Sequence, residues 1–85
     1  MLIDLVKKAT NLLGENFDIE LIECHHNVKV DSPSGTALTI AEAINEEMNN
    51  TLEFKFGRHD NNERRKKNEL GIHAVRGGTV VGRHE

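Results

Sequence analysis

Apolar residues recur at helical spacing over the first part of the chain. They are Leu2, Leu5, Val6, Ala9, Leu12 and Leu13. Lys7, Lys8 and Asn11 fall on the opposite side, and this separation is typical of an amphipathic helix. Gly14 follows, and glycine is common just after the last helical residue. We therefore expect a helix over about residues 2–13.

The segment DIELIEC, residues 18–24, changes to a period of two. Ile19, Leu21 and then His25 occupy alternate positions, so their side chains would share one face of a strand. The pattern predicts a strand that is mostly buried.

A second helical pattern follows a polar stretch. Its apolar positions are Ala37, Ile40, Ala41, Ile44 and Met48. They predict an amphipathic helix from about Ser34 to Asn49. Pro33 lies at its entrance, where a missing backbone N–H costs nothing.

The last third of the chain is first hydrophilic and then alternating. Residues 57–69, GRHDNNERRKKNE, contain too few apolar side chains to be ordered by packing, so we expect an exposed, mobile loop. The segment GIHAVRGGTVVGRHE alternates and breaks at Gly77 and Gly78, which predicts a β-hairpin with a two-residue turn. The chain ends at Glu85, in or just after a strand, so we expect a fold truncated at its C-terminus, with an open sheet edge near residues 79–84.

The order helix, strand, helix, hairpin favours an α+β fold with a sandwich-like arrangement, in which helices cover a mixed sheet. The 85 residues form at most one domain or part of one. The net charge of −3 provides no basic field for nucleic acid, and no apolar run approaches the ~18 residues of a membrane span. The single cysteine, Cys24, fits a reducing compartment and a cytoplasmic protein.

The stretch CHHNVKVDSPSGTAL, residues 24–38, carries the candidate chemistry. A helix N-terminus offers free backbone N–H groups and a partial positive charge. Gly35 would let a ligand approach the backbone, and Thr36 adds a hydroxyl donor. These are also ordinary residues at a helix start, but His25, His26 and Lys29 add proton-donating groups just ahead of it. The cluster predicts a site for a small anion.

Two other interpretations of these residues are weaker. Adjacent histidines on a strand point in opposite directions, and the chain has neither a Cys pair nor histidines at i, i+4 spacing, so we expect no metal site. His59, His73 and His84 are scattered along the sequence and could equally be surface residues. A nucleophilic role for Ser34 is disfavoured because PSGT lacks the strand-to-elbow context of a hydrolase.

The stretch ECHHNVKVDSPSGTA closely resembles the signature of the dihydrodipicolinate reductase (4-hydroxy-tetrahydrodipicolinate reductase) family, nicotinamide-dependent enzymes of bacterial lysine and diaminopimelate synthesis. The phrases FGR, ELGIHAVRGG and VVGRH, together with Arg65, are similar to later phrases of the family. The chain departs from the pattern at Ser32, where alanine is usual, at Thr79, where aspartate is common, and at Arg83, where glutamate is usual.

The resemblance implies residue roles. It makes His25 an acid/base residue and Lys29 the proton donor during hydride transfer. The other implied contacts to substrate are His26, Ser34, Gly35 and Thr36. The implied substrate is a cyclic dicarboxylate, the cofactor is NADH or NADPH, and the assembly is a homotetramer.

The Gly-rich βαβ turn of a dinucleotide-binding domain is not found in the sequence, since VRGGTVVG precedes a strand and not a helix. The resemblance therefore implies that residues 1–85 form part of the substrate-binding and oligomerisation domain, without the dinucleotide-binding domain. Such a chain would not bind the cofactor and would be inactive alone. The alternative is a non-catalytic oligomerisation module, which self-association without dicarboxylate-induced shifts at His25, Lys29 and Thr36 would favour.

Overall fold

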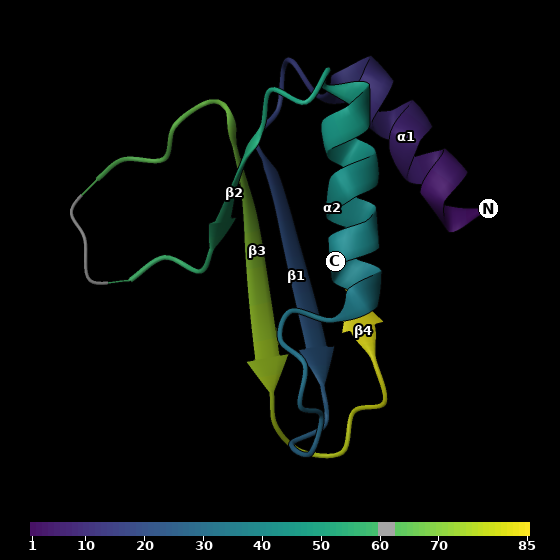
Figure 1. Cartoon of the computed structure of the whole chain (residues 1–85), viewed down its shortest axis with the longest axis vertical. Coiled ribbons are helices and arrows are strands. Elements are labelled where there is room, and N and C mark those ends of the chain that lie inside the picture. The colour runs from purple at the N-terminus through teal and green to yellow at the C-terminus, as the bar shows by residue number, and fades with distance from the viewer. Residues whose placement is uncertain (60–62) are drawn as a thin grey trace.

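The computed structural model describes residues 1–59 and 63–85, in which the chain forms two helices and four strands (Figure 1). In chain order they are α1 (Leu2–Leu13), β1 (Ile19–His25), α2 (Gly35–Glu47), β2 (Glu53–Phe56), β3 (Glu69–Arg76) and β4 (Arg83–His84). The predicted α+β class and the helix–strand–helix order are confirmed, with α1 at the predicted bounds. The short strand β2 was not predicted, because its four residues give little alternation to recognise.

The strands form one mixed sheet in the order β2-β3-β1-β4. Strands β1 and β3 run parallel, as do β2 and β3, and the last strand, β4, is antiparallel to β1. The predicted hairpin is therefore wrong, since β3 and β4 lie on opposite sides of β1. The two glycines pair with the end of β1 instead: Gly77 N donates to His25 O at 3.1 Å, and Asn27 N donates to Gly78 O at 3.2 Å.

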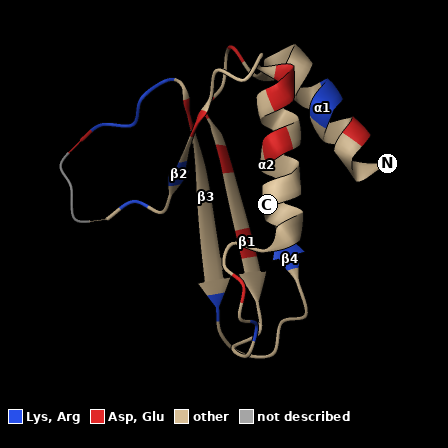
Figure 2. Cartoon of the chain, in the orientation of Figure 1, with Lys and Arg blue, Asp and Glu red and all other residues tan. Residues whose placement is uncertain are grey.

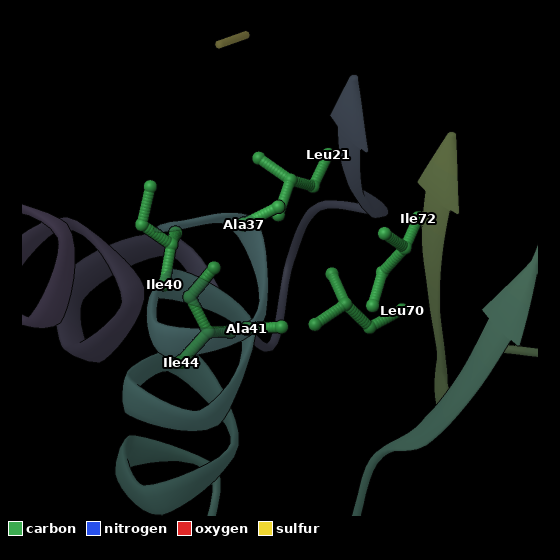
Figure 3. Close-up of a cluster of buried hydrophobic side chains, with 7 residues drawn as sticks. All are labelled: Leu21, Ala37, Ile40, Ala41, Ile44, Leu70 and Ile72. Atoms are coloured by element: carbon green, nitrogen blue, oxygen red, sulfur yellow. The ribbon is translucent and has the colours of Figure 1, made fainter. Parts of the chain in front are cut away.

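The hydrophobic core lies between α2 and the central strands β1 and β3 (Figure 3). Its members are Leu21, Ala37, Ile40, Ala41, Ile44, Leu70 and Ile72. Helix α1 lies beside α2, away from the sheet (Figure 1), and contributes Ile3 and Val6 to the edge of this core. No helix among the described residues covers the other face of the sheet, where Ile22 is 41% and Val75 49% exposed.

The segment between β2 and β3 extends away from the sheet, and Lys and Arg gather along it (Figures 1 and 2). Its described residues are largely exposed, as predicted, while residues 60–62 lie outside the described residues. Two of its arginines differ from the prediction of a freely solvated loop, because Arg58 and Arg65 bind Glu20 of β1. Glu69 also differs, since it is 7% exposed at the start of β3. Mobility of the segment stays a prediction.

A search of the described residues finds no helix that is both long enough and apolar enough to cross a membrane.

Candidate functional site

The predicted polar stretch lies at the edge of the sheet where the parallel strands β1 and β3 end and α2 begins (Figure 1). Ser34 is the N-cap of α2, and its hydroxyl accepts a hydrogen bond from Ala37 N at 3.1 Å. Ligands commonly bind at the carboxyl edge of parallel strands, where helix N-termini converge. The local sequence thus places its cap and its polar residues at a position suited to binding.

A buried carboxylate, that of Glu23, holds this region together. Its side chain is fully buried and accepts hydrogen bonds from Ser34 N at 2.5 Å and from the guanidinium of Arg76, and it lies 3.1 Å from His25 Nδ1. Burial raises the pKa of Glu23, but hydrogen bonds from Arg76, Ser34 and His25 outweigh it and lower the pKa from 4.5 to about 2. Glu23 is therefore ionised at neutral pH.

His25 lies beside this carboxylate and is itself only 8% exposed. Its ring packs edge-on against the ring of His84, with 5.3 Å between centroids, and His84 Nε2 lies 3.2 Å from Ser34 Oγ. A Cβ at Gly82 would lie 3.1 Å from His25 Nε2, so the glycine makes room for that ring nitrogen. His84, which the sequence left open as a possible surface residue, is half-buried and contacts both His25 and Ser34.

Arg76 connects the end of β3 to the loop that precedes α2. One guanidinium nitrogen binds Glu23, and the other donates to the backbone oxygen of Asp31 at 2.7 Å. Its side chain is 16% exposed, and its Nε is buried without a hydrogen-bond partner in the part of the chain that the structure describes. Arg76 therefore holds the loop from His26 to Ser34 to the sheet near the C-terminal end of the loop.

Lys29 lies within this loop and pairs with Asp31, with 3.0 Å between Nζ and Oδ1. The hydrogen bond from Lys29 lowers the pKa of Asp31 and outweighs burial, which raises it, and the backbone N–H of Gly35 lowers it further. Lys29 and the start of α2, both predicted to bind an anion, thus already face a carboxylate of the chain.

The remaining predicted residues surround the start of α2. Gly35 and Thr36 are exposed, and no atom lies within 4 Å of a Cβ position at Gly35, so a ligand can approach this backbone. His26 is half-buried, and its Nδ1 is buried with no hydrogen-bond partner among residues 1–59 and 63–85. Within those same residues, no group of three or more His, Cys, Asp or Glu side chains could hold a metal ion.

Three residues of the cluster were not predicted from the sequence. Glu23 could have been recognised from the sequence, because it alternates with Leu21 and His25 and shares the buried face of β1 with them. A carboxylate on a buried face requires hydrogen-bond or charged partners. Arg76 lies opposite His25 in the parallel ladder, and His84 lies opposite Glu23 in the antiparallel one. Neither of these neighbours could be predicted from the sequence, because each depends on how β3 or β4 pairs with β1.

Comparisons with known proteins find relatives that match the chain over nearly its whole length. A family model described as "Dihydrodipicolinate reductase, C-terminus" matches residues 1–85. Proteins named 4-hydroxy-tetrahydrodipicolinate reductase from Caldanaerobacter subterraneus, Clostridium botulinum and Staphylococcus carnosus are 58%, 53% and 46% identical over 85, 81 and 85 residues. These matches cover 100%, 95% and 100% of this chain, and 34%, 32% and 34% of the relatives.

A solved structure with a similar fold is the dipicolinate-bound dihydrodipicolinate reductase from Paenisporosarcina sp. TG-14. It superposes with a TM-score of 0.64 and 29% identity, over 96% of this chain and 32% of that one. The chain therefore spans about a third of the length of the proteins it matches.

Proposed function

The chain belongs to the dihydrodipicolinate reductase family, to the part described as its C-terminus, and on this premise we propose that it forms the substrate-binding part of an NAD(P)H-dependent 4-hydroxy-tetrahydrodipicolinate reductase. The proposed reaction reduces an unsaturated cyclic dicarboxylate to tetrahydrodipicolinate, in lysine and diaminopimelate synthesis. A cytoplasmic location is part of the proposal, and the free thiol of Cys24 is compatible with it.

One observation carries this proposal: Lys29 and the start of α2 already face a carboxylate, that of Asp31. The same donors are suited to a carboxylate of the substrate. Gly35 and Thr36 would hold it through backbone N–H groups and the Thr36 hydroxyl, with Ser34 shaping the turn and His26 at its side. The dipicolinate held by the Paenisporosarcina reductase is a ligand of this type.

The proposed chemistry at the site is proton transfer. A nicotinamide cofactor, NADH or NADPH, would supply the hydride, and the proposal assigns its binding to a dinucleotide-binding domain that would lie outside these 85 residues. Lys29, as an ammonium, would deliver the proton to the atom that does not receive the hydride. His25 would act as the acid/base residue beside it.

A dicarboxylate titration of the chain tests substrate binding. We expect dipicolinate to shift the NMR signals of His25, Lys29 and Thr36, and Thr36→Ala to weaken binding about tenfold. Thr39→Ala is the matched control, because Thr39 is also exposed on α2 but lies one turn further along. Saturating dipicolinate that leaves these three residues unshifted would reject the substrate assignment.

A graft tests the reaction. We propose to replace the matching segment of the Caldanaerobacter reductase with this chain, which is 58% identical to it, and to measure turnover. In the graft, Lys29→Ala should lower kcat by about 10²-fold or more and change KM less. Lys8→Ala, on the exposed side of α1, is the control. Unchanged kcat in Lys29→Ala would remove the proton-donor role.

Self-association is the second part of the proposal, because the family resemblance implies a tetramer. Strand β4 is an edge of the sheet, and the sheet face that carries Ile22 and Val75 is partly exposed. Sedimentation across a concentration series checks this, and a strict monomer at high concentration would count against it. The chain alone should also show no NADH or NADPH binding in a nicotinamide fluorescence titration.

A further inference from the structure

The buried carboxylate of Glu23 has no role in the proton transfer proposed above, yet it is bound from three directions. Its partners come from three elements: His25 on its own strand, Ser34 at the cap of α2 and Arg76 at the end of β3. A fully buried charge is costly unless every lone pair is used, so its retention in a small domain calls for an explanation.

The geometry fixes which ring nitrogen of His25 can react. Nδ1 lies 3.1 Å from Glu23 Oε1, and an ionised carboxylate can only accept, so Nδ1 carries the hydrogen. Nε2 makes no hydrogen bond to the described residues and lies where Gly82 has no side chain. Nε2 is therefore the nitrogen left to exchange a proton.

The groups around His25 orient its ring through Glu23. The charged and titratable neighbours are Glu23 on β1, Arg76 on β3 and His84 on β4, and Ser34, the cap of α2, contacts two of these groups. Among the described residues, Glu23 is the group within hydrogen-bond distance of His25 Nδ1, and Arg76 binds the same carboxylate. A carboxylate so placed accepts the Nδ1 hydrogen and fixes the orientation of the ring.

The same carboxylate contacts both ends of the loop before α2. It lies beside His25, just before the loop, and accepts a hydrogen bond from the N–H of Ser34, the last residue of the loop, while its partner Arg76 holds the backbone of Asp31 within the loop. Lys29 lies between these points.

We propose that Glu23 is a positioning residue: it fixes His25 with the hydrogen on Nδ1 and Nε2 free to exchange protons, and it holds the loop that carries Lys29. The role of Glu23 in catalysis rests on the proposed function, but the tautomer of the His25 ring can be tested in the isolated chain.

The first test is NMR of the histidine rings in the 85-residue chain across a pH series. We expect neutral His25 to carry its hydrogen on Nδ1 in the unaltered protein. In Glu23→Gln, the amide can donate as well as accept, so part of neutral His25 should carry its hydrogen on Nε2 instead. A neutral His25 with its hydrogen on Nε2 in the unaltered protein would overturn the inference without any variant.

The control is Glu20→Gln, which removes a carboxylate from the same strand but from its other face. It should leave the His25 tautomer unchanged. A folded Glu23→Gln whose neutral His25 keeps its hydrogen entirely on Nδ1 would overturn the inference, and so would a loss of this tautomer in Glu20→Gln. If Glu23→Gln does not fold, Glu23→Asp keeps a carboxylate acceptor but retracts it by one methylene, and a smaller part of neutral His25 should then carry its hydrogen on Nε2.

The second test uses the graft described above. Glu23→Gln should lower kcat about tenfold or more, with KM changed less. If the unaltered graft is inactive, the proposed function fails while the NMR result still decides the role of Glu23. If the graft is active and Glu23→Gln does not change kcat, the positioning role is rejected.

Discussion

Two glutamates of strand β1 lie three residues apart and on opposite faces of the sheet. Glu23 is fully buried beneath the start of α2, whereas the side chain of Glu20 is 31% exposed on the face without helices. Each is bound by arginine and histidine side chains. Glu20 binds Arg58 at 2.5 Å, Arg65 at 3.0 Å and His73 at 2.8 Å.

The pKa of both carboxyls is about 2, although their surroundings differ. Burial raises the pKa of Glu20, and its hydrogen bonds with Arg58, His73 and Arg65 outweigh this effect. Gly71 lies opposite Glu20 in the ladder and leaves space for the carboxylate, as Gly82 does for His25. Equal pKa values therefore do not imply equal structural roles, since Glu23 organises a candidate site and Glu20 holds the segment after β2 to the sheet.

Removing each carboxylate should separate these roles most clearly. Glu23→Ala leaves Arg76 buried without its partner, so the free energy of unfolding should fall by about 3–5 kcal/mol. Glu20→Ala should cost about 1 kcal/mol or less, because water can solvate Arg58 and Arg65. Urea unfolding followed by circular dichroism measures both, and equal losses would show that the exposed network is as important as the buried one.

Lowering the pH should reduce the stabilising contribution of both carboxylates, because both have a lowered pKa. Each has a folded pKa of about 2, below its ordinary value of 4.5. The stability that each contributes is present above pH 4.5 and is lost as the pH falls toward 2, because the unfolded chain then binds more protons. Stability measured from pH 6 to pH 2 should decrease, and Glu20→Gln and Glu23→Gln should each make the decrease shallower. An unchanged slope in either variant would contradict the lowered pKa of that residue.

Salt should produce the smallest difference. At 1 M NaCl the Debye length is about 3 Å, so the exposed ion pairs of Glu20 should weaken while the buried pair of Glu23 and Arg76 persists. The cost of Glu20→Ala should shrink by about half or more between 0.05 and 1 M NaCl. The cost of Glu23→Ala should stay nearly constant over that range, and a similar decrease in both would mean that water reaches Glu23.

The same contrast explains what the sequence could predict. Helices, the strand of Glu23 and the polar loop are local patterns, and their bounds were predicted within about two residues. The candidate residues His25, Lys29 and Ser34 could be proposed from the sequence because they lie within one short stretch. Their proposed roles came from the resemblance and stay predictions.

What the sequence could not predict depends on pairing between distant strands. Gly77 and Gly78 satisfy a hairpin pattern, but the chain passes beneath the end of β1 and returns on its other side. That path brings Arg76 and His84 to Glu23, from 53 and 61 residues further along the chain. In the same way, the RRKK run predicted only a solvated loop, because nothing in the local sequence indicates that Arg65 binds Glu20.

The parallel pairing of β1 with β3 has a consequence for the order of events during synthesis. Glu23 leaves the ribosome before Arg76 and His84, which follow only near the end of these 85 residues. Until then the carboxylate has no cation, and α2 has no completed sheet to pack on. The candidate site should therefore form late and all at once, and a nascent chain that stops before β3 should hold neither the histidine orientation nor the loop.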